Sequence, residues 1–397
     1  MADRAAHLVD HVLPPVPVRQ WVLTLPYRLR YLVAWNHDLC RAVVGVFLRS
    51  VLAFQRRAAR RSGAADGRGG AIAVVQRFGR ALNLNVHVHA LVIDGVFVSE
   101  AGGLAFAPAA ALCDLDVAEV LATVVPRIHA LLVRRGYADD EGGSGAPDTF
   151  AEAAPALAGM AAAAVQGTTA MGERAGVRTR RCGEALDHAG ASPLPRCHAS
   201  QDGFDLEAGV RVRADERDRL ERLCRYVLRP PLADERLRLL DNGDVLLALE
   251  RRWSDGTTHL RFSPVELLER LAVLIPRPRV NLVLYHGVLG ARAASRSRVV
   301  AFGTAGETAA PDAALPDTPR PAQAATAGGR RWAELMRRSY GLDVLACPRC
   351  GGRLRLVALI DDRSVIERIL RHLGFPTELP AMRPGRSPPL LDEDPTP

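Results

Sequence analysis

Residues 83–97, NLNVHVHALVIDGVF, carry the pattern on which the fold of this chain depends. The run 86–93 consists of Val, Leu, Ile and Ala apart from two histidines, and it predicts a buried β-strand. Because strand side chains alternate, His87 and His89 lie on the same face. A buried imidazole needs a hydrogen-bond partner or a metal ion. The pattern therefore predicts a strand and also asks which partner, a hydrogen-bonding group or a metal ion, the two imidazoles have.

The two histidines are placed well for binding one ion. Residues two apart in a strand have Cα atoms about 6.6 Å apart, so both rings can reach the same metal. The alternative is a pair of core histidines satisfied by backbone or carboxylate groups. The H-x-H pattern alone is not specific, because two ligands do not complete a metal site.

The segments on either side alternate between strand and helix patterns. Each pattern ends at Gly, Pro or Asp-Gly signals. The expected elements are strands at 16–25, 71–78 and 86–93, helices at 38–61, 111–135 and 215–229, a hairpin at 245–263 and a helix that starts with the capping box of Ser263 and Glu266.

The composition limits the class of protein. The 397 residues allow two or three domains, and the 52 basic residues, all arginine, give a net charge of +8. Arginine suits phosphate partners, although charge alone also fits a merely basic protein in solution. We find no signal peptide and no apolar run long enough to cross a membrane. Seven cysteines without framework spacing indicate a reducing cytoplasm.

The stretch DERDRLERLCRYVLRPP, residues 215–231, predicts a second informative element. Its apolar residues recur at helical spacing and form one stripe. Tyr226 lies about 130° from the centre of that stripe, on the side that carries most of the arginines. Arginines would lower the phenol pKa and bind a phosphate for it to attack, whereas the alternative is a surface tyrosine that covers a helix flank. The arginines on this side are Arg219, Arg222 and Arg229.

Taken together, the histidine pair and the tyrosine helix resemble the HUH endonuclease superfamily. Further blocks extend the likeness, among them RQWVLTLP, LCRYVLRPPLADERLRL, RFSPVELLERLAVLIPRP and DVLACPRCGG. As an ordered set they resemble the transposases of rolling-circle insertion sequences, within the insertion-sequence ninety-one family and its common-region (ISCR) group. The blocks cover most of the chain outside two linkers of low complexity.

The resemblance implies a fold and a mechanism. It implies an α+β class with an antiparallel sheet, a central histidine strand, helices on one face and a small C-terminal module. It also implies that His87 and His89 bind Mg²⁺ or Mn²⁺ and that Tyr226 attacks single-stranded DNA. A 5′-phosphotyrosine bond and a free 3′-OH would result, and rejoining would need no ATP. Arg219, Arg222 and Arg229 are the expected DNA-binding residues.

The sequence does not decide which residue is the third protein ligand of the expected metal ion. Two imidazoles suit Mg²⁺ only if DNA phosphate and water complete the octahedron. Gln76, in the preceding strand, is our choice, with Asp94 as another candidate. A core or surface role for Gln76 is equally compatible with the sequence.

The sequence departs from the family pattern in two places, and both change the activity that we expect. Arg222 stands where two-tyrosine members carry a second tyrosine, so a single-tyrosine enzyme is expected. No Cys-rich zinc-binding region precedes the first strand, which suggests a shortened copy with impaired recognition of DNA ends. Two alternatives follow: a non-catalytic DNA-binding relic, and a metal-dependent phosphoesterase without a covalent tyrosine.

The C-terminal region carries Cys347-x-x-Cys350, which resembles a zinc knuckle. A structural zinc normally needs four ligands, and no second C-x-x-C follows. We expect a bacterial cytoplasmic protein associated with the nucleoid, with no membrane partner. The expected organisation is a first nuclease part at 1–136, a low-complexity insertion at 137–202, the rest of the nuclease at 203–302, a linker at 303–330, the C-x-x-C module at 331–375 and a disordered tail at 376–397.

Overall fold

The computed structural model describes most of the chain. The described residues are 2–100, 103–138, 148–183, 197–233, 236–278, 280–303, 332–354, 360 and 362–377. The linker and the tail expected at 303–330 and 376–397 therefore fall almost wholly outside them. The domain boundaries stay a prediction. No helix in the described ranges has both the length and the apolar character needed to cross a bilayer.

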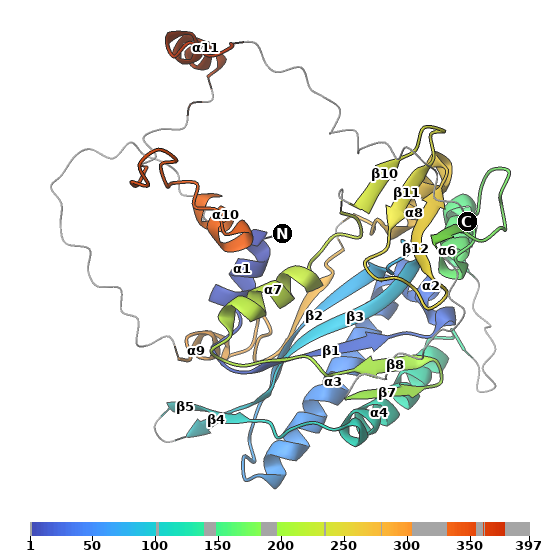
Figure 1. Ribbon diagram of the computed structural model, residues 1–397. Helices are drawn as coiled ribbons and strands as arrows, with labels where there is room; N and C mark the ends of the chain where they lie inside the picture. The colour runs from blue at the N-terminus through green and yellow to red at the C-terminus, as the bar shows by residue number, and fades with distance from the viewer. Residues whose placement is uncertain are drawn as a thin grey trace.

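The centre of the fold is an antiparallel sheet (Figure 1). In the described residues it has seven strands in the order β13-β2-β3-β1-β8-β7, and β9 pairs with β1. The histidine strand β3 lies in the middle, as expected. The strands are β1 (Val18–Thr24), β2 (Gly70–Phe78), β3 (Leu84–Ile93), β7 (His198–Gln201), β8 (Phe204–Glu207), β9 (Arg211–Val212) and β13 (Val283–Gly287).

The register of the central strands sets which side chains are neighbours. Thr24 in β1 and Gln76 in β2 both lie opposite His87. Residues directly opposite each other in a sheet project from the same face. His87 is therefore flanked on its own face by Thr24 and Gln76.

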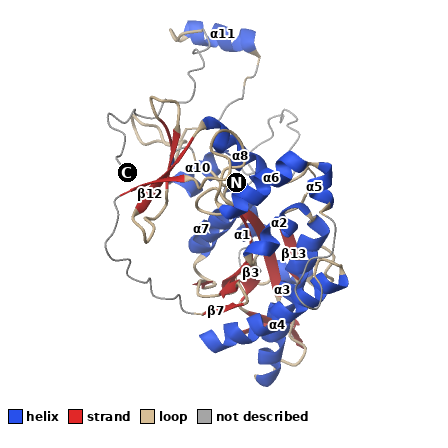
Figure 2. Cartoon of the chain, turned by 90° about the vertical axis from the view of Figure 1, so that its right-hand side faces the viewer, coloured by secondary structure: helices blue, strands red, loops and turns tan. Residues whose placement is uncertain are grey.

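Helices cover both faces of this sheet. The face of Val88, Ala90 and Val92 packs against α2 (Tyr27–Trp35), α3 (His37–Arg61) and α4 (Asp114–Arg134). The histidine face packs against α1 (Ala2–His11) and α7 (Arg217–Val227). Figure 1 shows α1 and α7 on one side and α3 and α4 on the other, and Figure 2 shows the same layers from the side.

The α+β class with an antiparallel sheet is confirmed, and the structure adds a second helical layer where helices on one face were expected. The reason is the apolar stripe of α7. Leu220, Cys224 and Val227 are buried against the sheet and α1. A helix with such a stripe must bury it against another element.

Local signals explain the helix boundaries. Asn36 accepts a hydrogen bond from the Leu39 amide (2.9 Å) and starts α3. The expected capping box of Ser263 and Glu266 starts α8 (Pro264–Leu274). The tyrosine helix is shorter than the expected 215–229 and begins after Glu216, whose carboxylate accepts from the Arg213 amide (2.8 Å).

A second sheet and a hairpin flank the central one. The second sheet has the order β10-β11-β12-β6, and the expected hairpin at 245–263 forms its β11–β12 pair. Its strands are β6 (Arg180–Gly183), β10 (Leu237–Leu239), β11 (Val245–Ala248) and β12 (Thr257–Phe262), and the separate hairpin is β4 (Gly95–Glu100) with β5 (Gly103–Pro108).

Part of the expected insertion at 137–202 is folded. It contains α5 (Thr149–Ala153) and α6 (Pro155–Gln166), and α6 packs in the main core. The buried Arg270 of α8 donates to the Ala164 carbonyl (3.2 Å) and the Thr168 carbonyl (2.7 Å). The Ala-rich composition that suggested a flexible connector instead allows α6 to approach α8 closely. Residues 139–147 and 184–196 lie outside the described part.

Three further helices follow α8 in the described residues. They are α9 (Arg296–Val300), α10 (Trp332–Tyr340) and α11 (Arg363–His372). Arg338 of α10 forms ion pairs with Asp10 of α1 and Glu221 of α7. The C-terminal region therefore contacts the histidine face through the helices that cover it.

Candidate active site

The histidine strand and the tyrosine helix meet at one end of the central sheet. The ring centroids of His87 and His89 lie 4.9 Å apart. The Tyr226 ring lies 5.9 Å from the His89 ring, edge to face. The side chain of Tyr226 is 45% exposed, whereas His89 is 4% exposed. The phenol is therefore open to solvent beside a buried imidazole.

Each imidazole has one nitrogen in use. The Nδ1 of His87 donates to the carbonyl of Asn85 (2.9 Å), so its Nε2 carries the lone pair. The Nδ1 of His89 lies 2.7 Å from the side-chain nitrogen of Gln20. The Nε2 of His89 is buried and has no hydrogen-bond partner among the described residues. A buried nitrogen without a partner is the kind of atom that a metal ion can satisfy.

Both imidazoles are neutral at neutral pH. Burial, together with the nearby His87 and Arg229, lowers the pKa of His89 to about 3. Burial also lowers the pKa of His87, against the opposing effect of the Asn85 carbonyl. Neutral imidazole is the form that binds metal ions.

The protein donors for a third ligand are few. No group of three or more His, Cys, Asp or Glu side chains converges in the described ranges. Gln76 lies beside His87, and its Nε2 donates to the carbonyl of Val227 (2.7 Å) at the end of α7. Its Oε1 is the atom left for an ion. If these residues hold a divalent ion, the protein would supply two imidazoles and one amide oxygen, and water and substrate would have to complete the coordination shell.

Asp94, the other candidate for third ligand, is excluded by its position. It follows β3 at the end opposite His87, with 1% of its surface exposed. Its carboxylate accepts hydrogen bonds from Arg19 (2.9 and 3.2 Å) and Arg211 (2.6 Å). Both carboxylate oxygens are thus committed to arginines in β1 and β9.

Arg229 lies across the phenol ring. Its guanidinium carbon is 4.7 Å from the centroid of the Tyr226 ring. Glu250, which follows β11, forms ion pairs with both Arg229 and Arg236. A carboxylate of the second sheet therefore holds the arginine that faces the phenol.

A family model matches the part of the chain that carries this site. Residues 70–298 match a family described as "Putative transposase", over more than half of the chain and including His87, His89 and Tyr226. The chain belongs to this transposase family. Neither curated proteins nor solved structures gave a significant match.

The other two arginines expected to bind DNA are farther from the phenol of the transposase. Arg219 is two turns nearer the start of α7 and pairs with Glu216 (3.1 Å). Arg222 is exposed one turn before Tyr226. Only Arg229 contacts the phenol ring among these three arginines.

Two residues of this site escaped the sequence-based reasoning. Gln20 is a polar residue in a mostly buried strand, which is a usable signal, but only the β1–β3 register places it diagonal to His89. Glu250 carries no local signal, because an acidic residue near a hairpin turn is ordinary. Its contact with Arg229 arises from the way the second sheet packs.

Cys347 and Cys350 of the transposase lie in a tight turn. The Gly351 amide donates to the Cys347 carbonyl (2.8 Å), and Cys347 donates its own amide to the Gly352 carbonyl (2.8 Å). Backbone amides of Arg349 and Cys350 lower the pKa of the Cys347 thiol. Two thiols are thus close together, and the described residues supply no further His, Cys, Asp or Glu to complete a site. Zinc at this turn stays a prediction.

Proposed function

We propose that this transposase is a single-tyrosine HUH enzyme of the rolling-circle type, related to the insertion-sequence ninety-one family and its ISCR group. It would cut and rejoin single-stranded DNA during transposition. The observation that supports this proposal most is the approach of the solvent-accessible Tyr226 to the His89 ring, 5.9 Å between centroids. A nucleophile beside neutral metal-binding imidazoles suits attack on a phosphodiester.

In the proposed reaction, the Tyr226 Oη attacks phosphorus and the bond from phosphorus to the 3′-oxygen breaks. The phenol loses its proton and the leaving 3′-oxygen gains one. The products are a 5′-phosphotyrosine and a free 3′-OH. Attack of a 3′-OH on this bond reverses the step and restores the phenol, so the ester energy is conserved.

The neighbouring arginine has a defined task in this scheme. The guanidinium of Arg229 is stacked over the phenol ring, so phosphate bound to it lies beside Oη. Arginine holds phosphate oxygens in a bidentate manner and stays charged throughout. Arg229 therefore orients the scissile phosphate and balances the charge that develops on it.

The donor set fits a divalent ion held by His87, His89 and the Gln76 amide oxygen. When bound, Mg²⁺ or Mn²⁺ would polarise the scissile phosphate. For His89 Nε2 to act as a ligand, its Nδ1 must carry the proton. A 180° rotation of the Gln20 amide places its oxygen at Nδ1 as the acceptor, without any other movement.

The test uses the complete chain and overlapping single-stranded oligonucleotides that tile the DNA on both sides of its gene, with Mn²⁺. A covalent protein–DNA adduct is detected as a band of slower mobility on a denaturing gel. The wild type and a Tyr340→Phe control, altered at an exposed tyrosine in α10, should form the adduct. The Tyr226→Phe protein should form none.

Other outcomes separate the alternatives. An adduct in the Tyr226→Phe protein would show that a different nucleophile acts. Hydrolysis without an adduct in both proteins would favour a metal-dependent phosphoesterase. Salt-dependent DNA binding without cleavage would favour a non-catalytic relic.

A further inference from the structure

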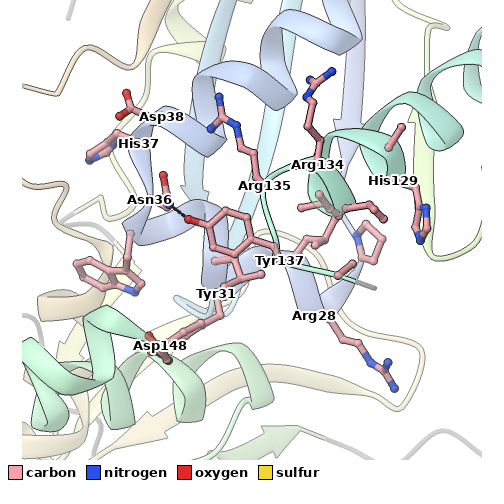
Figure 3. A pocket seen from close by; sticks show the side chains of 18 of the residues that line it. Arg28, Tyr31, Asn36, His37, Asp38, His129, Arg134, Arg135, Tyr137 and Asp148 are labelled. Carbon is pink, nitrogen blue, oxygen red and sulfur yellow. Dashed lines mark hydrogen bonds between the residues drawn. The ribbon is translucent and has the colours of Figure 1, made fainter. Parts of the chain in front are cut away.

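A large cavity bounded by described residues lies away from Tyr226, on the other side of the central sheet. It is a cleft between α2, the C-terminal half of α4 and α5, with a volume of about 1740 Å³ (Figure 3). Small-molecule pockets usually measure roughly 300–1,000 Å³. The cleft is therefore large enough for several units of a polymer.

Two tyrosines form the aromatic part of this cleft. The Tyr31 hydroxyl donates to the Asp148 carboxylate (2.7 Å), and the Tyr137 hydroxyl accepts from the Asn36 side chain (2.5 Å). Both side chains are partly accessible. The hydroxyl contacts fix the rings in place, and a fixed, accessible ring is a surface on which a nucleobase can stack.

Arginines from three segments line the same cleft. They are Arg28 of α2, Arg134 and Arg135 at the end of α4, and Arg277 after α8. None of the four forms an ion pair with a carboxylate among the described residues, whereas Arg229 and Arg236 beside the phenol both pair with Glu250. They outnumber the three aspartates of the lining. Unpaired guanidinium groups beside aromatic rings suit the phosphates and bases of a single strand.

The chain connects the active-site end of the sheet to one wall of the cleft. Strand β1 ends at Thr24, directly opposite His87, and the chain enters α2 three residues later. The first turns of α2 carry Arg28, which is exposed, and Arg30, whose positive charge contributes to the lowered pKa of His87. A strand that leaves the active site can therefore round the end of β1 along a basic helix start.

We propose that the cleft between α2, α4 and α5 is a second DNA subsite that binds unpaired nucleotides of the strand cut at Tyr226. Bases stack on Tyr31 and Tyr137, and the arginines hold the phosphates. This inference rests on the proposed function, because it assumes that the substrate is single-stranded DNA. It adds a location for the DNA that lies beyond the scissile phosphate.

The test compares binding of labelled oligothymidylates of about 6 and about 20 nucleotides by fluorescence anisotropy. A short strand can occupy the active site alone, whereas a long one can also reach the cleft. The Arg134→Ala/Arg135→Ala protein should lose about tenfold in affinity for the long strand and keep its affinity for the short one. An Arg368→Ala/Arg371→Ala protein, which loses equal charge on exposed α11, should bind both as the wild type does.

A second variant tests the stacking. The Tyr137→Leu protein should also bind the long strand more weakly, but with an unchanged salt dependence, because no charge is lost. Thermal melts check that each variant is folded. Equal binding of both lengths by wild type and the double arginine variant, or an equal loss for both lengths, would overturn the proposal.

The adduct assay and the binding assay together distinguish failure of the cleft proposal from failure of the proposed function. If the protein forms the adduct on gene-flanking DNA but the cleft variants have no effect, the proposed nuclease function stands and the cleft subsite is contradicted. If no adduct forms and binding does not depend on strand length, both the proposed function and the cleft subsite are contradicted.

Discussion

At the scale of single residues, Gln20 is the side chain that would control whether His89 is available to the proposed metal ion. An imidazole whose Nδ1 donates its proton to a neighbouring oxygen keeps its Nε2 lone pair free. Gln20 is the side chain that lies 2.7 Å from this Nδ1. It is itself buried in β1, with 5% of its surface exposed, so its position is well defined.

Replacing Gln20 by leucine should therefore weaken Mn²⁺ binding. We expect the dissociation constant, measured by isothermal titration calorimetry, to rise about 10–100-fold. The Gln55→Leu protein is the matched control, because Gln55 is also a buried glutamine but donates to the Ile93 carbonyl (2.8 Å). An unchanged constant in the Gln20→Leu protein would show that His89 needs no such partner.

The buried imidazole of His89 also makes the stability of the metal-free protein depend on pH. The pKa of His89 is about 3 in the folded state and near 6.5 when unfolded. As pH falls below 6.5, the unfolded chain binds the proton first, so the free energy of unfolding decreases until about pH 3. Above 6.5 this group has no effect on stability.

We expect the free energy of unfolding to fall by about 2 kcal/mol from His89 alone between roughly pH 7 and pH 5. Urea unfolding at the two pH values, with chelator present, measures the difference. The His89→Gln protein lacks this group and should lose correspondingly less stability. The same pH dependence in both proteins would contradict the lowered pKa.

At the scale of elements, the end of α7 is held from two sides. Gln76 of the central sheet donates to the carbonyl of Val227 (2.7 Å). Glu250 of the second sheet pairs with Arg229, which covers the phenol ring. The end of the tyrosine helix is thus held by Gln76 and Glu250 as well as by the buried stripe of α7.

The Glu250→Gln substitution should change DNA binding. Arg229 and Arg236 lose their carboxylate partner and become available to phosphate, so binding of single-stranded DNA should tighten several-fold. The dependence of affinity on salt should steepen by about one to two counterions. The Glu119→Gln protein is the control, because its exposed pair with Arg57 lies between α3 and α4. Weaker DNA binding in the Glu250→Gln protein would contradict this view of Glu250 as a competitor of phosphate.

At the scale of the whole molecule, helix α10 is linked by ion pairs to α1 and to the tyrosine helix α7. Arg338 donates to the carboxylates of Glu221 (2.9 Å) and Asp10 (2.9 Å). Glu221 is 4% exposed, so Arg338 compensates a charge that is otherwise buried. Residues more than a hundred positions apart along the chain therefore share one electrostatic network.

Removing that arginine should loosen α7. We expect the Arg338→Ala protein to lose about 3 kcal/mol of stability, because the buried Glu221 is left without its cation. Hydrogen exchange should be faster in α7 than in α3. The Arg353→Ala protein, which loses an exposed pair with Asp343, should be unaffected. Unchanged exchange in α7 would show that α10 only rests on the surface.

The features of the molecule that could be predicted from sequence are those with a local cause. The strand at 86–93 followed from its apolar residues, and the start of α8 followed from the capping box of Ser263 and Glu266. The displacement of Tyr226 from the apolar stripe followed from helical periodicity. The folding of residues 155–166 into the packed helix α6 did not follow from the sequence. An alanine-rich segment has the same composition in a flexible connector and in a closely packed helix.

Periodicities of two and 3.6 residues were enough to place the histidine pair on one strand face and Tyr226 beside the apolar stripe of its helix. The α+β class was expected from the family resemblance of the sequence blocks, and the antiparallel sheet confirms it. The groups that surround these side chains depend on the tertiary structure. It placed Gln20 on His89, Gln76 on the end of α7 and Glu250 on Arg229, and it turned Asp94 away toward two arginines. The register of antiparallel strands and the packing of two sheets bring distant residues together, and no local pattern in the chain encodes such contacts.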